Sequence, residues 1–242
     1  MTDLRAVVAG TGMMGPGIAS TLAAGGIATC LVSRKSESAD DGLLQAKVLL
    51  STLEKEGLLS SAQFATALQC LSRSTDLDVQ VVNADLVVES IPEDLALKQR
   101  FFQRLASVAP GKTILASNTS GISITAIAAG CEHPERIITT HFWNPPHLMP
   151  LVEVVMGQRT AEQVAQQTMD ILKRCGKTPV LVRKDTPGQL GNRLQHALVR
   201  EAIHIIHEGL ATTEDVDLAV KNGFGLRGER ALSGSMLSGD TI

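Results

Sequence analysis

A glycine-rich hexapeptide near the N-terminus places the strongest constraint on how this chain can fold. It follows an apolar run over residues 6–9 and opens a helical stretch over residues 14–24. Its members are Gly10, Thr11, Gly12, Met13, Met14 and Gly15. In a strand–turn–helix unit the first glycine permits a tight turn, the second lets the backbone approach a pyrophosphate, and the third allows the helix to pack closely on the strand. Because the amino end of the helix offers unpaired N–H groups to an anion, the motif predicts a dinucleotide site formed by these residues.

The first 185 residues alternate short β-branched runs with helical stretches, which is typical of a doubly wound parallel sheet. The expected strands cover residues 4–9, 27–32, 84–88, 113–116, 136–140 and 151–155. Between the second and third of them, the apolar positions of residues 39–70 have helical spacing with a break at Gly57. This pattern predicts a helical hairpin inserted into the nucleotide-binding fold.

The alternation stops after Lys184. A turn over residues 185–188 leads into a long helix expected over residues 190–208, and a second helix begins near Thr213 with Thr212 or Thr213 as its N-cap. We therefore predict the α/β class, with a Rossmann-type NAD(P)-binding domain over residues 1–185 and the start of an all-α domain over residues 186–227. Residues 228–242 lack a periodic apolar face and are predicted to be a disordered tail.

Composition and charge exclude several classes of partner. The formal net charge is −3 with no long basic run, which argues against nucleic acid or an acidic membrane as a partner. No apolar stretch approaches the ~18 residues needed to span a bilayer, and no secretory signal is visible, so we expect a cytoplasmic protein. The four cysteines are widely spaced without a zinc pattern, so we expect reduced thiols and no metal site. The chain has no tyrosine, which excludes mechanisms with a tyrosine general acid.

The residues after the second expected strand bear on the choice of cofactor. A site selective for NAD has an acidic residue there to accept hydrogen bonds from the ribose 2′-hydroxyl. Here Ser33, Arg34 and Lys35 follow the strand, and the first carboxylate is Glu37. A serine and two cations suit a 2′-phosphate, so NAD or NADP is the predicted cofactor, with NADP favoured. The alternative is an exposed basic turn that contacts nothing.

Polar residues also follow the later strands, where the carboxyl ends of a doubly wound sheet face the ligand crevice. Ser120 closes a polar run after the strand at 113–116, and His141 directly follows the strand at 136–140. Glu153 lies in the apolar run 151–155, and a buried carboxylate needs a partner. Since the Pro145–Pro146 turn can bring the two strands together, His141 and Glu153 can meet. Such a pair forms a general base, in which the carboxylate orients the imidazole and stabilises its cation.

The alternatives to a catalytic pair are a histidine with a purely structural role and an ion pair between Glu153 and an arginine such as Arg193. Five motifs favour the functional interpretation. In chain order they are GTGMMGPGIA, ADLVVESIPEDLALK, SNTSGISIT, HFWNPPHLMPLVEVV and KDTPGQLGNRL. With these motifs the chain resembles the 3-hydroxyacyl-CoA dehydrogenase family over residues 1 to about 227. The resemblance implies an oxidoreductase that transfers a hydride between NAD(P) and the 3-hydroxyl or 3-keto carbon of a 3-hydroxyacyl-CoA.

The resemblance also implies roles for individual residues. His141 is the general base and Glu153 its orienting partner. Ser120 and Asn192 donate to the substrate oxygen, and Asn144 belongs to the same pocket. Glu93 and Lys98 contact the nicotinamide side of the cofactor, and Asn118 makes another contact with the cofactor. A homodimer is implied as well, and the helical hairpin would help to hold coenzyme A.

The chain departs from the family pattern at several positions. Ser33 stands in place of the acidic ribose ligand, and Gly121 replaces the second serine of a Ser-Ser pair. Trp143 lies in a loop that differs from the commoner HFFNPVP form and resembles branches acting on hydroxy sugar acids and oxidised pyridine rings. The family continues beyond GFGLR, so we expect a shortened, incomplete C-terminal domain whose long helix self-associates or is poorly stable.

Other functions stay open at this point. The first is a dehydrogenase of a free 3-hydroxy acid or another non-CoA alcohol in the same superfamily. The second is a non-catalytic nucleotide-binding remnant. The short β-hydroxyacid dehydrogenases share the GxGxMG opening but use a catalytic lysine, and the predicted pairing of His141 with Glu153 argues against them.

Overall fold

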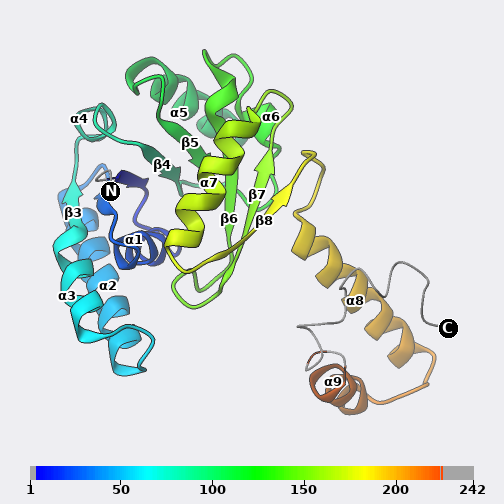
Figure 1. Ribbon diagram of the computed structural model, residues 1–242. Helices are drawn as coiled ribbons and strands as arrows, with labels where there is room; N and C mark the ends of the chain where they lie inside the picture. The colour runs from blue at the N-terminus through cyan, green and yellow to red at the C-terminus, as the bar shows by residue number, and fades with distance from the viewer. Residues whose placement is uncertain (1–3, 224, 226–242) are drawn as a thin grey trace. The chain divides into compact units, whose positions relative to one another are not determined.

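The computed structural model describes residues 4–223 and 225 of the chain, which falls into two compact units, Met1–Gln189 and Leu190–Ile242 (Figure 1). The first unit is an α/β domain built on a sheet whose described strands have the order β3-β2-β1-β4-β5-β6-β7-β8. This confirms the predicted Rossmann-type fold. The division between the units lies a few residues later than the predicted boundary after residue 185.

The strands of the first unit are short and the helices alternate with them. The strands are β1 (Arg5–Ala9), β2 (Ala28–Val32), β3 (Leu71–Ser74), β4 (Leu86–Glu89), β5 (Ile114–Ser117), β6 (Ile137–Phe142), β7 (Leu151–Met156) and β8 (Thr178–Val182). The helices are α1 (Gly15–Ala24), α2 (Ser36–Lys55), α3 (Ser61–Cys70), α4 (Leu77–Val81), α5 (Leu95–Val108), α6 (Ile124–Ile127) and α7 (Glu162–Arg174).

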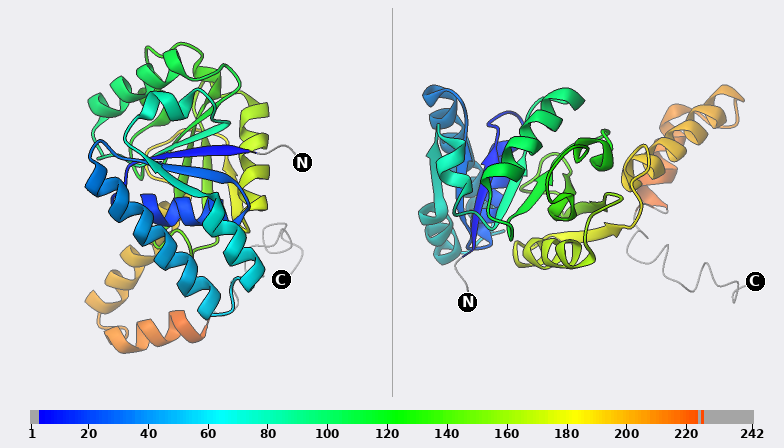
Figure 2. Two further views of the ribbon diagram at one scale, coloured as in Figure 1. Left: turned by 90° about the vertical axis from the view of Figure 1, so that its left-hand side faces the viewer. Right: turned by 90° about the horizontal axis from the view of Figure 1, so that it is seen from above.

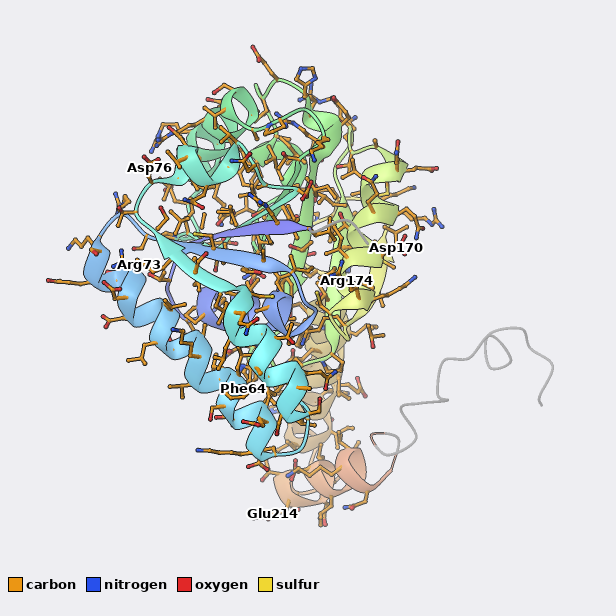
Figure 3. All side chains as sticks on the ribbon, turned by 60° about the vertical axis from the view of Figure 1, so that its left-hand side comes forward. Phe64, Arg73, Asp76, Asp170, Arg174 and Glu214 are labelled. Atoms are coloured by element: carbon orange, nitrogen blue, oxygen red, sulfur yellow. The ribbon has the colours of Figure 1, made fainter. Side chains whose placement is uncertain are left out.

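The sheet lies between two layers of helices (Figure 2). Apolar residues on each of its faces pack into a core cluster with the helices on that side. Successive residues of β1 point to opposite faces. Val8 belongs to the core cluster that contains residues of α1, α2, α3 and α7, whereas Val7 belongs to the cluster that contains residues of α4, α5 and α6. Arg174 at the end of α7 donates to the carbonyl oxygens of Gly25 and Gly26, which joins α7 to the turn between α1 and β2 (Figure 3). The sheet is therefore covered on both faces, as central parallel strands require.

The inserted helical hairpin is present as α2 and α3. The break between them extends from Glu56 to Ser60, and α3 begins with a capping box in which Ser60 and Gln63 satisfy each other's backbone N–H groups. Phe64 on α3 packs partly buried against the core cluster around α1 (Figure 3). The strand β3 that follows was not predicted, because Leu-Ser-Arg-Ser carries a single apolar residue. Parallel pairing with β2 makes it a strand.

The sheet is not parallel throughout. Strand β7 runs antiparallel to β6, with His141 opposite Glu153. The expectation of a parallel sheet is wrong at this edge, because the connection between β6 and β7 is too short for a crossover helix. The connection contains a cis peptide bond between Asn144 and Pro145.

The second unit contains α8 (Leu190–His207) and α9 (Thr213–Asn222). Thr212 is the N-cap of α9, and its side chain accepts a hydrogen bond from the Asp215 N–H. No described residue of either helix is buried. Across the described residues, no helix is both long and apolar enough to cross a bilayer. The tail predicted for residues 228–242 lies outside the described residues.

Candidate active site

The turn after β1 has the geometry that the glycine motif predicts. Gly10 has a φ of +117°, and a side chain there would come within 2.2 Å of the Ser90 carbonyl oxygen. A side chain at Gly15 would come within 2.0 Å of the Gly10 carbonyl oxygen, so both positions require glycine. At Gly12, by contrast, an added Cβ meets no atom within 4 Å. The backbone at Gly12 therefore faces open space that a pyrophosphate can approach closely.

This turn opens onto a cavity of about 880 Å³. Helix α1 begins there with Met14 as an N-cap that makes no side-chain hydrogen bond, and its first turn contains no acidic residue. The amino end of α1 can therefore receive the phosphates of a dinucleotide. The cavity brings together these residues of the predicted cofactor site: Gly10, Gly12, Met13, Met14, Ser33 and Arg34.

The basic turn after β2 borders a second hollow of about 500 Å³. Ser33, Arg34, Lys35 and Ser38 line it, and the first two also line the larger cavity. Helix α2 begins at Ser36, and its N-cap Lys35 makes no side-chain capping bond. Two cations, two hydroxyls and a helix amino end therefore surround this hollow, a donor set that suits a phosphate.

Lys98 of α5 lies buried beside the carboxyl end of β4. Its Nζ is 2.6 Å from Oε1 of Glu89 and 3.2 Å from Oε2 of Glu93. Glu89 is also buried, and its other oxygen accepts the hydroxyl of Ser117 at 2.5 Å. The charge of Lys98 is therefore compensated within the protein, and Lys98 is not among the residues lining the large cavity.

Glu93 holds the polar loop that follows β5. Its Oε1 accepts the Thr119 hydroxyl and the backbone N–H groups of Ser120 and Gly121. Burial alone would raise the pKa of Glu93, but the Thr119 hydroxyl and the Lys98 charge outweigh it and lower the pKa. A carboxylate that stays ionised thus fixes the backbone beside Ser120, a predicted substrate contact.

His141 and Glu153 form a direct pair across β6 and β7. His141 Nδ1 lies 2.7 Å from Glu153 Oε2, and the Glu153 side chain is fully buried. Because Nδ1 faces the carboxylate, Nε2 is the nitrogen available to exchange a proton with a substrate. Trp143, just beyond β6, donates its Nε1–H to the same Glu153 oxygen at 3.1 Å.

The three asparagines predicted for the site lie in different parts of the fold. Asn118 follows β5, and its side-chain oxygen accepts the Phe142 N–H at 2.9 Å, which ties the ends of β5 and β6 together. Asn144 is exposed in the turn between β6 and β7. Asn192 lies in the first turn of α8, in the second unit, so its part in the site stays a prediction.

Three residues hold this region together through contacts that the sequence patterns did not predict. Thr119 bonds Glu93, and Trp143 bonds Glu153. Lys177 is buried and donates to the carbonyl oxygens of Pro146 and Met149 at 2.6 and 3.0 Å. Burial lowers the pKa of Lys177. A signal existed for Trp143, since alternate residues of a strand share one face, but nothing in the sequence links Lys177 to the distant Pro146.

Family models match both units of the chain. The model of the 3-hydroxyacyl-CoA dehydrogenase NAD binding domain matches residues 5–186. The model of the 3-hydroxyacyl-CoA dehydrogenase C-terminal domain matches residues 188–229.

Individual relatives agree with the family models. A probable 3-hydroxybutyryl-CoA dehydrogenase of Bacillus subtilis is 38% identical over 90% of this chain and 75% of its own length. A 5-formyl-3-hydroxy-2-methylpyridine 4-carboxylate 5-dehydrogenase of Mesorhizobium japonicum is 35% identical over 91% of this chain and 70% of its own length. The crystal structure of 3-hydroxybutyryl-CoA dehydrogenase from Escherichia coli K12 superposes with a TM-score of 0.85 at 36% identity, covering 92% of this chain and 47% of that one.

Proposed function

The chain belongs to the 3-hydroxyacyl-CoA dehydrogenase family of oxidoreductases, with an NAD-binding domain over residues 5–186, and from this premise we propose its reaction and site. The proposed reaction transfers a hydride between NAD(P) and the 3-hydroxyl or 3-keto carbon of a 3-hydroxyacyl-CoA. The observation that carries the proposal is the buried contact of 2.7 Å between His141 and Glu153. This pair lies at the edge of the sheet where a doubly wound fold binds its ligands.

In the proposed mechanism His141 moves the proton of the substrate hydroxyl. Its Nε2 accepts that proton during oxidation and returns it to the substrate oxygen during reduction. Glu153 keeps the imidazole oriented through Nδ1 and stabilises the cation that forms. The nicotinamide, when bound, supplies the hydride acceptor or donor.

The proposed substrate contacts complete the site. Ser120 and Asn192 donate hydrogen bonds to the reacting oxygen, and Asn144 lines the same pocket. The support for Ser120 is its backbone, which Glu93 holds in place at 3.1 Å. On the cofactor side we assign Glu93 and Lys98 to the nicotinamide half, Asn118 to a further contact with the cofactor, and the glycine turn to the pyrophosphate.

For the adenosine half we propose a preference for NADP. The support is the hollow lined by Ser33, Arg34, Lys35 and Ser38 at the amino end of α2. No acidic side chain is among the residues that line this hollow. Donors and positive charge suit a 2′-phosphate, whereas a 2′-hydroxyl is best bound by a carboxylate.

The alternative substrate is a non-CoA alcohol. The Mesorhizobium japonicum relative is named for a pyridine carboxylate that is not a CoA ester, and its similarity covers nearly the same share of this chain as that of the Bacillus subtilis relative. This relative therefore favours a substrate without coenzyme A. A turnover panel separates the two: 3-hydroxybutyryl-CoA, free 3-hydroxybutyrate and 5-formyl-3-hydroxy-2-methylpyridine 4-carboxylate, each with NAD and NADP, with the His141→Ala variant as the blank. We expect turnover of the CoA ester. A folded, cofactor-binding protein that turns over none of them would overturn the catalytic proposal.

A further inference from the structure

We propose that Trp143 is a positioning residue, which acts on the reaction by fixing the carboxylate of Glu153 through its indole N–H. Nε1 of Trp143 lies 3.1 Å from Glu153 Oε2, and His141 Nδ1 lies 2.7 Å from that same oxygen. One carboxylate oxygen therefore receives two donors, one of which belongs to the proposed general base. This inference rests on the proposed function of His141.

The strand geometry explains why these three side chains meet. Trp143 comes two residues after His141, and alternate residues of an extended chain point to the same side. Glu153 is the residue of β7 directly opposite His141 in the antiparallel pairing. The rings of His141 and Trp143 have centroids 6.0 Å apart, with their planes tilted by 54°. The cluster is thus built by β6, β7 and the first residue after β6.

The chemistry of the indole suits this position. Glu153 is fully buried, and a buried carboxylate is stable only when donors surround its charge. The Trp Nε1–H only donates and does not titrate, so its bond to Glu153 persists whether His141 carries one proton or two. Since the indole holds Oε2 in place, Nδ1–H stays engaged with the carboxylate and Nε2 stays directed to proton transfer.

A double-mutant cycle tests whether Trp143 acts through Glu153. Trp143→Phe keeps an apolar ring and removes the donor, and we expect kcat to fall about tenfold with KM and cofactor Kd unchanged. In the Glu153→Gln background the same substitution should cost little more. An equal loss in both backgrounds, or a loss confined to KM, would overturn the proposal in favour of packing or direct substrate contact.

A second measurement does not depend on turnover. Trp143 is the single tryptophan of the chain, so a ¹⁵N correlation spectrum contains one indole N–H signal. We expect this signal downfield, as for an N–H bonded to a carboxylate, with slow exchange and an upfield move in Glu153→Gln. A rapidly exchanging signal that ignores Glu153→Gln would refute the bond. If the unaltered protein turns over no substrate, the proposed function fails, while the spectrum still decides the contact.

Discussion

His141 and Glu153 lie on adjacent strands of the central sheet and form the proposed proton-transfer pair, so removing either side chain should lower turnover. We predict that His141→Ala or Glu153→Ala lowers turnover by about 10²–10⁴-fold, because general base catalysis contributes that range. Cofactor binding should persist, since the glycine turn belongs to β1 and α1. Steady-state kinetics and a cofactor titration measure both quantities. His133→Asn is a matched control: His133 is exposed, and asparagine tolerates its φ of 53°. Near-normal activity in a folded His141 or Glu153 variant would contradict the assignment.

Ser33 and Arg34 are the residues from which we predict the choice between NAD and NADP. We expect the unaltered protein to bind NADP(H) at least as tightly as NAD(H), because the hollow beside α2 is rich in donors and cations. Ser33→Asp should shift the preference toward NAD by roughly tenfold, since a carboxylate accepts the 2′-hydroxyl and repels a 2′-phosphate. Side-by-side titrations of both cofactors test this. A strong NAD preference before any substitution would mean that Arg34 and Lys35 point to solvent.

At the scale of elements, Lys177 anchors the turn between β6 and β7. It donates to two carbonyl oxygens of that turn, and Thr21 of α1 donates to one of them, that of Pro146, at 3.2 Å. We predict that Lys177→Met lowers the free energy of unfolding by roughly 1–3 kcal/mol, because it leaves buried carbonyl oxygens short of a donor. Denaturant unfolding measures the loss. Lys173→Met, which removes an exposed lysine of α7, is the control and should change stability little. Equal stability of the two variants would show that the turn needs no anchor.

Some of these elements could be predicted from the sequence and others could not. The glycine turn and the hairpin could be predicted because their signals are local: a tight turn after an apolar run, and helical spacing with a break. The pairing of His141 with Glu153 also followed from a local feature, the Pro145–Pro146 turn. Strand β3 could not be predicted, since its identity comes from pairing with β2. The contacts of Lys177 could not be predicted either, because nothing near this lysine in the sequence indicates that it will donate to the carbonyl oxygens of Pro146 and Met149.

At the scale of the whole molecule, α8 carries apolar side chains that the described residues of its own unit leave exposed. Its large exposed apolar residues include Leu194 and Ile203, which are 58% and 61% exposed. Contiguous exposed apolar surface is rare in soluble monomers, and burying such a side chain stabilises by ~1.5–3 kcal/mol. We therefore propose that two copies of the chain associate through α8 to form a homodimer. In the monomer, the second unit should have low stability.

Light scattering combined with limited proteolysis tests this association. The unaltered protein should have a mass above that of one 25.6 kDa chain. Replacing Leu194 and Leu198 by glutamine should shift it toward the monomer and expose the second unit to cleavage, because both side chains lie on one face of α8 at helical spacing. Leu44→Gln, which removes a similarly exposed leucine from α2 in the first unit, should leave the mass unchanged. A protease-resistant monomer over the full 242 residues would contradict the prediction, since some other segment of the chain would then have to cover α8.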